Sequence, residues 1–335
     1  MKDVAEAANV SFKTVSRVVN EESGVSALLA NRVHVAIGAL GYHRDDRAKS
    51  LRRRNERSAT IGFAHADMAN PFFVAVHEAV ERVASEQACL ILTGTSGEDV
   101  ECLDALVCAF AERRVDGLVV VPAANMQASM APALRAEIER GTPVVFIDRE
   151  PGLPGDVVLS DHRGGAIRAT EHLIRGGHRH IAFIGDQRDL FSAVERRAGF
   201  VDAVEKADHM TGKFITDVHN PRAAEKAVVE LMRLGVNERP TALFAAQNYI
   251  MLGAVKALHA LGLQNEIAIV GFDDLVMANV IDPGLTVVAQ DVEELGRRAG
   301  ALLFDRLAGR LSEPVRVVIP VSLIARGSGE IPAPA

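Results

Sequence analysis

The sequence lacks the features that would place the chain in a membrane or outside the cell. No run of about 18 apolar residues occurs, so we expect no transmembrane helix. The first residues are polar and charged, and no signal peptide is expected. The only cysteines, Cys89, Cys102 and Cys108, are odd in number and match no zinc-binding spacing. We therefore expect a cytoplasmic protein whose thiols are packed or lie at the surface.

The sequence also lacks a recognisable catalytic or metal-binding motif. It contains no GxSxG, no P-loop and no HExxH. Gly176-Gly177 is expected to end a helix, and His178 and His180 have no further ligands at metal spacing. We therefore expect no catalytic residue, no metal and no cofactor, and we do not expect an enzyme.

Charge is distributed unevenly along the chain. The 37 Lys and Arg residues and 44 Asp and Glu residues give a net charge of −7. Residues 1–57 hold 11 of the basic and 7 of the acidic residues, so this region carries +4 and the remainder −11. The asymmetry predicts a polyanion-binding N-terminal region on an acidic body that nucleic acid repels.

Residues 2–20, KDVAEAANVSFKTVSRVVN, predict two short helices joined by a tight turn. The first should run from about Lys2 to Ala8, Asn9 tolerates the left-handed backbone of the turn, and Ser11 is suited to cap the second helix. The valines of the second helix recur at helical spacing and should face a small core. Its other face carries groups that can read base edges in a DNA major groove, namely Phe12, Lys13, Ser16, Arg17 and Asn20. An ordinary helical hairpin is the alternative, and the cationic face argues against it.

A third helix is predicted from about Ser26 to Leu40, ended by Gly41. Its buried stripe is expected to consist of Leu29, Val33, Ala36, Ile37 and Leu40. Residues 45–57, DDRAKSLRRRNER, have almost no apolar face and cannot bury enough surface to fold alone. This segment is either a linker that becomes helical when its basic residues meet phosphates or a permanently flexible one.

From residue 60 onward, short apolar runs alternate with amphipathic helical segments. This βαβα alternation predicts parallel sheets covered by helices on both faces, and about ten strands favour two α/β subdomains. The expected strands are TIGFAHA (60–66), CLILT (89–93), DGLVVV (116–121), PVVFID (143–148), DVVLS (156–160), HIAFIG (180–185), FITDV (214–218), TALFAA (241–246), AIVGFD (268–273) and TVVAQ (286–290).

Polar side chains cluster where these strands end, which is where ligands bind in open α/β sheets. Each one alone could be only the cap of the next helix. Together, their carboxylates, guanidinium groups, amides and aromatic rings are typical of a site for a polyhydroxylated ligand. The candidates are Asn70-Pro71-Phe72-Phe73, Asp148-Arg149, Gln247-Asn248, Asp273-Asp274 and Gln290-Asp291, with Arg196 and Arg197 early in the helix after HIAFIG.

The order and spacing of several segments resemble the LacI/GalR family of bacterial transcription regulators over essentially the whole chain. The segments are VSFKTVSRVVN (10–20), LGYHRDDRAKSLR (40–52), ANPFF (69–73), RRVDGLVVVP (113–122), IDR (147–149), GHRHIAFIG (177–185), ERRAGF (195–200), VGFDD (270–274) and LTVVAQ (285–290). The body segments are also shared with periplasmic sugar-binding proteins, especially ribose-binding ones.

This resemblance implies a role for individual residues of the N-terminal region. Phe12 and Lys13 match the variable positions that read the operator. Residues 45–53 resemble the hinge helix that folds on operator DNA, and Leu51 matches the leucine that wedges into the minor groove. The expected DNA-binding residues are Phe12, Lys13, Thr14, Ser16, Arg17, Asn20, Leu51 and Arg52.

The resemblance also implies the fold and its division. A small all-α helix-turn-helix head (residues 1–44) and a hinge (45–57) precede a periplasmic-binding-protein-like α/β body (58–330) of two doubly wound parallel-sheet subdomains. The N-subdomain should span about 58–159 and 291–320, and the C-subdomain about 160–290 and 321–330. Three chain crossovers should join them. By match to the sugar-binding pattern, nine residues would line an effector cleft whose ligand is a pentose, a hexose or a derivative. They are Asn70, Phe72, Phe73, Asp148, Arg149, Arg196, Gln247, Asp273 and Gln290.

The implied function is that of a homodimeric repressor that binds a near-palindromic operator and responds to a monosaccharide effector. Gln247-Asn248 stands where Asn-Asp is usual, and the longer side chain of Gln247 and the lost charge at Asn248 should alter ligand choice. No leucine heptads follow VSLIARGSGE, so we do not expect a tetramer built on a C-terminal coiled coil. A sugar-binding transport protein and a sugar-metabolising enzyme are the alternatives. The basic N-terminal region argues against the first, and the lack of a supported base, nucleophile or metal against the second.

Overall fold

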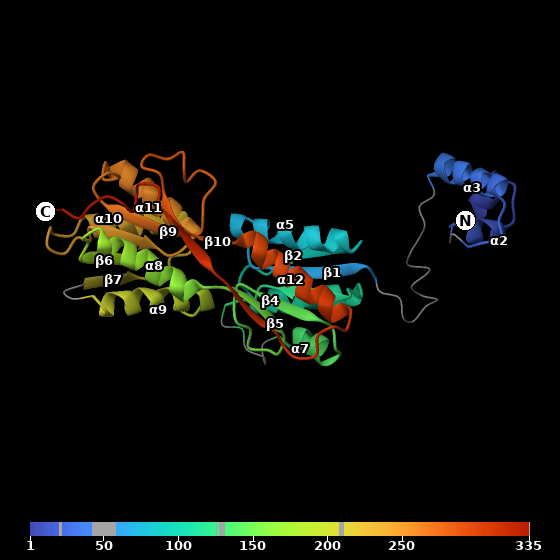
Figure 1. The fold of residues 1–335 in the computed structure, drawn as a ribbon, viewed down its shortest axis with the longest axis horizontal. Coiled ribbons are helices and arrows are strands. Elements are labelled where there is room, and N and C mark those ends of the chain that lie inside the picture. Colours follow the sequence, from blue (N-terminus) through green and yellow to red (C-terminus); the bar gives the residue numbers. More distant parts are fainter. Residues whose placement is uncertain (20–21, 42–57, 125, 127–130, 208–210, 335) are drawn as a thin grey trace. The chain divides into compact units, whose positions relative to one another are not determined.

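The chain folds into two compact units, Met1–Ser58 and Ala59–Ala335. The computed structural model describes residues 1–19, 22–41, 58–124, 126, 131–207 and 211–334 (Figure 1). The expected hinge helix at 45–53 therefore lies outside the described residues. No described helix is both long and apolar enough to cross a membrane.

Three helices form the head around a small apolar core. They are α1 (Lys2–Ala7), α2 (Phe12–Val19) and α3 (Ala27–Leu40). Asn9 takes the predicted left-handed conformation between α1 and α2, and the Ser11 hydroxyl accepts a hydrogen bond from the Thr14 amide at 3.1 Å, which caps α2. Arg32 of α3 donates to the Ala8 carbonyl at 2.6 Å and so ties the third helix to this turn. The core consists of Val4, Ala8, Val15, Val18, Val33 and Ala36.

The predicted stripe of α3 is only partly buried. Val33 and Ala36 are buried, and Leu29 and Ile37 are half-buried. Leu40 is 49 % exposed, so the prediction that it lies in the core is wrong. The buried side chains of the head gather around Val33 and Ala36, and the last turn of α3 extends past them before Gly41 ends the helix in the left-handed conformation.

The body contains two six-stranded sheets. The sheet of the N-subdomain has the order β11-β5-β4-β3-β1-β2 and is parallel throughout. Its strands are β1 (Thr60–His65), β2 (Leu90–Thr95), β3 (Gly117–Val120), β4 (Val144–Ile147), β5 (Asp156–Ser160) and β11 (Arg316–Ile319). The sheet of the C-subdomain has the order β12-β10-β9-β8-β6-β7, with β12 antiparallel to β10. Its strands are β6 (His180–Ile184), β7 (Thr211–Ile215), β8 (Ala242–Ala245), β9 (Ala268–Phe272), β10 (Thr286–Gln290) and β12 (Val321–Ile324).

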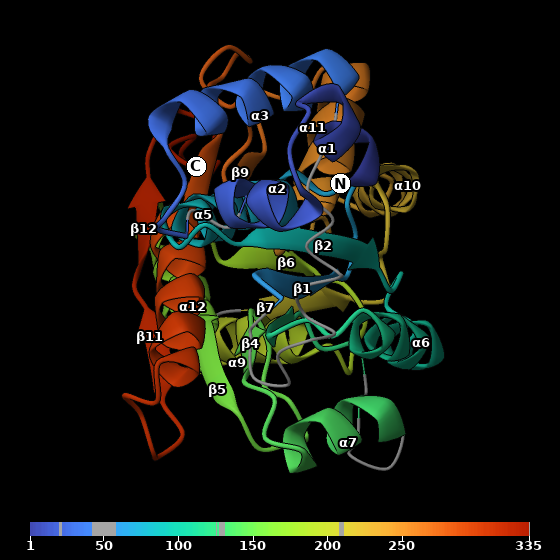
Figure 2. The same cartoon turned by 90° about the vertical axis from the view of Figure 1, so that its right-hand side faces the viewer.

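Helices cover both faces of each sheet (Figures 1 and 2). In the N-subdomain, α5 (Pro71–Glu86) and α12 (Val292–Leu307) lie on one face, and α6 (Val100–Glu112) and α7 (Pro132–Glu139) on the other. In the C-subdomain, α10 (Pro221–Met232) and α11 (Asn248–Leu261) oppose α8 (His162–Arg175) and α9 (Phe191–Glu205). The inner strands β1, β3, β4, β5, β8 and β9 are buried on both faces, which explains why they are continuous apolar runs in the sequence.

The chain passes between the two subdomains three times. The crossovers follow β5, β10 and β11, at residues 160–162, 290–292 and 319–321. Two of them are tied together, because the Asp161 amide donates to the Ile319 carbonyl at 2.9 Å and Arg168 donates to both Asp161 and the Val321 carbonyl. The doubly wound two-subdomain fold predicted from the sequence is thus confirmed.

Three details differ from the predicted strands. The edge strand β7 begins at residue 211 rather than 214, because its register is set by pairing with β6 and not by its most apolar residues. The short strands β11 and β12 were not predicted. The antiparallel β12 makes its sheet mixed rather than purely parallel.

Candidate functional site

The exposed face of α2 carries the groups expected to read DNA. The Phe12 ring is 53 % exposed and Lys13 is exposed, whereas Thr14, Ser16 and Arg17 are half-buried. The Thr14 hydroxyl lies 2.9 Å from the Ser11 hydroxyl, so this side chain also supports the start of the helix. The other three residues expected to contact DNA, Asn20, Leu51 and Arg52, lie outside the described residues.

A cavity of about 130 Å³ lies at the carboxyl ends of the strands of both sheets, between the two subdomains. All nine residues that the resemblance places in an effector cleft line it: Asn70, Phe72, Phe73, Asp148, Arg149, Arg196, Gln247, Asp273 and Gln290. The cavity is small beside the roughly 300–1,000 Å³ of sites for drug-sized ligands, so its size suits a small metabolite.

On the N-subdomain side, Arg149 is held by a carboxylate and a carbonyl. Its two terminal nitrogens donate to Glu98 at 2.5 and 2.7 Å, and one of them also donates to the Pro122 carbonyl at 2.9 Å. The Arg149 Nε atom lies 3.2 Å from Asp148. Burial raises the pKa of Asp148, and the guanidinium groups of Arg149 and Arg196 oppose this increase.

On the C-subdomain side, Arg196 has its own set of partners. It donates to the Ala246 carbonyl at 2.8 Å, lies 3.7 Å from Asp273 and stacks over the Phe272 ring at 3.7 Å. The other oxygen of Asp273 accepts a hydrogen bond from Gln290 Nε2 at 2.5 Å. This bond fixes the orientation of the Gln290 amide, because an ionised carboxylate only accepts. Gln290 Oε1 is buried and has no protein partner.

Backbone geometry helps to place these groups. Asp148 and Asp273 follow β4 and β9 with φ values of 71° and 75°, so each strand ends in a left-handed residue whose carboxylate turns into the cavity. Gly199 allows α9 to approach α8, since a Cβ atom there would lie 2.3 Å from the Arg163 carbonyl. This close packing brings Arg196 of α9 beside His162 of α8.

Two hydrogen bonds cross the cavity directly. Asn248 Nδ2 donates to Asn70 Oδ1 at 2.6 Å, and the Tyr249 hydroxyl donates to Asp67 at 3.3 Å. The same Asn70 oxygen accepts from the Phe72 amide and caps α5. Asn248 and Tyr249 begin α11, so the starts of one helix from each subdomain face each other.

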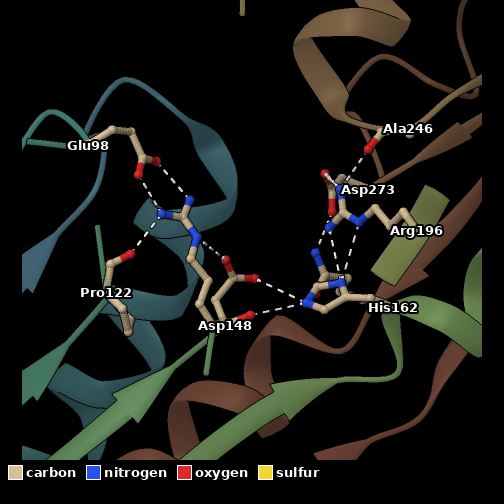
Figure 3. A network of polar contacts seen from close by, with 9 residues as sticks. Glu98, Pro122, Asp148, His162, Arg196, Ala246 and Asp273 are labelled. Atoms are coloured by element: carbon tan, nitrogen blue, oxygen red, sulfur yellow. Dashed lines mark hydrogen bonds and ion pairs between the residues drawn. The ribbon is translucent and has the colours of Figure 1, made fainter. Parts of the chain in front are cut away.

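A third link runs through His162 (Figure 3). Its Nε2 atom lies 3.1 Å from the Asp148 main-chain oxygen, and its Nδ1 atom lies 3.3 and 3.4 Å from two nitrogens of Arg196. His162 is 2 % exposed, and burial lowers its pKa to about 3, with a further contribution from Arg196. The ring is therefore neutral. It does not line the cavity itself but lies behind two residues that do.

Sequence reasoning missed about half of the lining. Asp186 follows β6 after a single glycine and carries the same strand-end signal as Asp273, so it could have been found. Glu98 and His219 lie in loops whose paths the sequence does not reveal. The residues not predicted are Asp67, Glu98, Asp186, Gln187, Leu190, Ser192, Ala193, His219, Ala246 and Tyr249.

Among the described residues, no group of three or more His, Cys, Asp or Glu side chains is arranged to hold a metal ion. His178 is buried and hydrogen-bonded to Thr241 and to the Ile331 carbonyl, so its role is structural.

A helix-turn-helix head on a two-subdomain body with a polar cavity defines a ligand-responsive DNA-binding regulator. Residues 1–45 match the family described as "Bacterial regulatory proteins, lacI family", and residues 170–329 match "Periplasmic binding protein-like domain". The chain belongs to the LacI family of bacterial regulatory proteins.

Two repressors and one solved repressor structure are similar to this chain over nearly its whole length. A ribose operon repressor of Halalkalibacterium halodurans is 31 % identical over 97 % of this chain and 96 % of its own. The transcriptional repressor PurR of Erwinia tasmaniensis is 30 % identical over 98 % of this chain and 96 % of its own length. The lac repressor dimer bound to operator and the anti-inducer ONPF superimposes with a TM-score of 0.83 at 26 % identity, covering 98 % of both chains. This protein is accordingly a DNA-binding transcriptional repressor controlled by a small-molecule effector, and not an enzyme.

Proposed function

We propose that the chain is a cytoplasmic, homodimeric repressor of a near-palindromic operator, and that its effector is an uncharged monosaccharide bound in the cavity. Residues 1–44 would form the reading head, 45–57 the hinge, and 58–330 the effector-binding and dimerisation domain. The division within this domain is 58–159 with 291–320 for the N-subdomain and 160–290 with 321–330 for the C-subdomain. The observation that carries the effector assignment is the charge balance of the cavity.

The cavity is rich in acceptors, and its lining residues, all of which the structure describes, hold more carboxylates than guanidinium groups. Five carboxylates line it: Asp67, Glu98, Asp148, Asp186 and Asp273. Arg149 is paired with Glu98, and Arg196 is bound to a carbonyl and to His162. A phosphate or carboxylate on the ligand would meet like charges, which disfavours sugar phosphates.

Hydroxyl groups suit the same cavity. Buried Gln290 Oε1 and Gln247 Oε1 have no protein partner, and each can accept a hydrogen bond from a sugar hydroxyl. The rings of Phe72 and Phe73 supply an apolar surface for the C–H side of a sugar ring. The ribose operon repressor among the relatives supports a sugar.

The effector assignment is tested by operator binding in the presence of candidate ligands. The operator is first selected from random duplexes, and its affinity is then measured by fluorescence anisotropy with neutral pentoses and hexoses, their phosphates and purine bases. A neutral sugar should change operator affinity, and its phosphate should not. A response to a purine base alone, or to the phosphate in preference to the parent sugar, would overturn the assignment.

The site is tested with Asp273→Ala. Loss of a charged acceptor for hydroxyls should weaken sugar binding about 10- to 150-fold, the equivalent of about 1.5–3 kcal/mol. Asp274→Ala is the matched control, because its carboxylate pairs with Arg326 instead. If Asp273→Ala keeps the wild-type sugar affinity, the effector does not bind in this cavity.

Dimerisation is supported by an exposed apolar patch between β9 and β10. Val276, Met277 and Val280 are 88 %, 54 % and 67 % exposed, although their neighbours Ala278 and Leu285 are buried. Contiguous exposed apolar side chains are typical of protein interfaces. Val276→Glu combined with Val280→Glu should produce monomers in sedimentation velocity and weaken operator binding, since one head then reads one half-site. Unchanged dimers in this variant would place the interface elsewhere.

A further inference from the structure

His162 occupies a position that is unusual for a residue outside the cavity lining. It is the first residue of α8 and stands at the crossover that follows β5, where the chain leaves the N-subdomain. Asp161 caps the helix by accepting a hydrogen bond from the Gly164 amide at 2.9 Å. The imidazole therefore projects from a fixed helix start at a point where the two subdomains meet.

The hydrogen bonds of His162 determine its tautomer. A guanidinium group has only donors, so Nδ1 must accept from Arg196. Nε2 then carries the proton and donates it to the Asp148 main-chain oxygen, with the Asp148 carboxylate 3.7 Å away. The Phe191 and Phe272 rings lie beside the imidazole, with centroids 6.1 and 5.9 Å from its own.

The two ends of this link belong to different subdomains. Asp148 follows β4 of the N-subdomain, whereas Arg196 lies in α9 of the C-subdomain, and both line the cavity. The remaining partners of Arg196 are its own subdomain's Ala246, Asp273 and Phe272. His162 thus forms a hydrogen-bonded connection between a ligand-facing group of the N-subdomain and a ligand-facing group of the C-subdomain (Figure 3).

We propose that His162 is a positioning residue that couples effector binding to operator affinity, by holding Arg196 in its ligand-facing orientation and fixing it to Asp148 across the crossover. A ligand that contacts Arg196 and Asp148 then binds both subdomains at once. Because His162 stands at the crossover after β5, a movement of either group also moves this crossover. This inference rests on the proposed effector site, and it adds a residue that does not touch the ligand.

Three substitutions separate the two ends of the link. His162→Phe keeps a planar ring and removes both hydrogen bonds. His162→Asn can place an acceptor near the Nδ1 position and keep Arg196. His162→Gln can place a donor near the Nε2 position and keep Asp148. His172→Gln is the matched control, because this histidine of the same helix pairs with Glu330 away from the cavity.

Sugar affinity is measured by calorimetry, and coupling is measured as the ratio of operator Kd values with and without saturating sugar. His162→Phe should weaken sugar binding about tenfold and bring the ratio at least tenfold closer to one. His162→Asn should keep sugar affinity near wild type and still lose coupling. A general loss of structure would instead lower the sugar affinity and the operator affinities with and without sugar together. Wild-type sugar affinity and wild-type coupling in a folded His162→Phe variant would overturn the proposal.

A second measurement needs no sugar and keeps the proposal testable if the effector is of another class. Nitrogen-15 NMR of histidine-labelled protein reports the tautomer of His162, with His162→Phe providing the assignment. The expected signal is a neutral ring protonated at Nε2, and Arg196→Met should disturb it. A ring protonated at Nδ1, or one that Arg196→Met leaves unchanged, would show that the link does not exist, whatever the cavity binds.

Discussion

At the scale of single residues, Lys13 offers the clearest test of the reading face of α2. Its ammonium group is exposed at the start of the helix and can donate to base edges in the major groove. Lys13→Ala should lower discrimination between the selected operator and single-base variants by about 1–3 kcal/mol, or roughly 5- to 150-fold, at the contacted position. Competitive binding of a panel of half-site variants measures this ratio.

Lys2→Ala provides the control for Lys13→Ala. Lys2 is also an exposed lysine of the head, but it lies in α1. Its loss should weaken binding slightly and equally for all sequences, as expected for a contact to phosphate or for none. Equal sequence preference in the wild type and Lys13→Ala would remove α2 from the role of reading helix.

Buried His65, which pairs with half-buried His77, predicts a loss of stability in acid. His65 Nε2 and His77 Nδ1 lie 3.0 Å apart, and burial, reinforced by His77, lowers the pKa of His65 to about 3. Between pH 6.5 and pH 3 the unfolded chain therefore binds a proton that the folded chain excludes. Stability is complete above the unfolded pKa and falls with pH, by about 2 kcal/mol from pH 7 to pH 5 for His65 alone.

Replacing both rings, in His65→Val/His77→Val, leaves no ring nitrogen unpaired and should flatten this acid dependence. Urea unfolding of the body at pH 7 and pH 5 gives the comparison. His259→Val, which removes an exposed ring from α11, is the control. An equal loss of stability in the wild type and the double variant would show that other groups cause the acid sensitivity.

The residues of the cavity could be predicted to the extent that they follow strands. Carboxyl ends of parallel strands meet at one edge, so Asp148, Asp273 and Gln290 were found from strand ends alone. Glu98 contacts Arg149 from a loop after β2, where its φ value is 65°. His162 reaches Asp148 only because the crossover after β5 places the start of α8 beside the end of β4. Neither the contact of Glu98 with Arg149 nor that of His162 with Asp148 has a local sequence signal.

At the scale of elements, the helix cap at Asn70 joins local stability to ligand binding. Asn70 caps α5 and also accepts the hydrogen bond from Asn248 across the cavity. Asn70→Ala should destabilise the body by about 1 kcal/mol through the lost cap and should also weaken sugar binding. Thermal unfolding and calorimetry measure the two effects.

Asn220 is the matched cap. It accepts from the Ala223 amide at the start of α10, which also begins with proline, but it does not line the cavity. Asn220→Ala should cost a similar amount of stability without changing sugar affinity. If both variants bind sugar equally well, the bond between Asn70 and Asn248 has no part in the binding site.

The predicted elements were most accurate where a strand is buried on both faces. Such strands are continuous apolar runs, and β1, β4, β6, β8 and β9 lie close to their expected positions. β11 and β12 are four residues each, are separated by Pro320 and lie at sheet edges, with only partial burial. Their pairing partners are about 160 and 35 residues away, so only the tertiary fold defines them.

At the scale of the whole molecule, we expect the unit Met1–Ser58 to read DNA and the unit Ala59–Ala335 to control when DNA is bound. The +4 of residues 1–57 supplies attraction to phosphates, and the −11 of the remainder opposes contact between the body and DNA. The cavity lies between subdomains that are joined by three crossovers, so a ligand there acts on their relative arrangement. Repression and its control are therefore separable by mutation.

This separation gives a prediction for the basic run Arg52–Arg54, which lies outside the described residues. Replacing all three with Gln should weaken binding to every DNA sequence, because phosphate contacts do not depend on the base. Each lost phosphate contact should lower the slope of log K against log salt by about 0.9. Titrations at several salt concentrations, with the selected operator and with random DNA, measure both effects.

The control removes the same charge from the body. Arg135, Arg233 and Arg310 are exposed there, and their joint replacement with Gln changes the net charge equally. If the basic run contacts phosphates, the salt slope should fall only in the Arg52–Arg54 variant. A similar fall in both variants would mean that overall charge, and not contact by the hinge segment, sets the affinity for DNA.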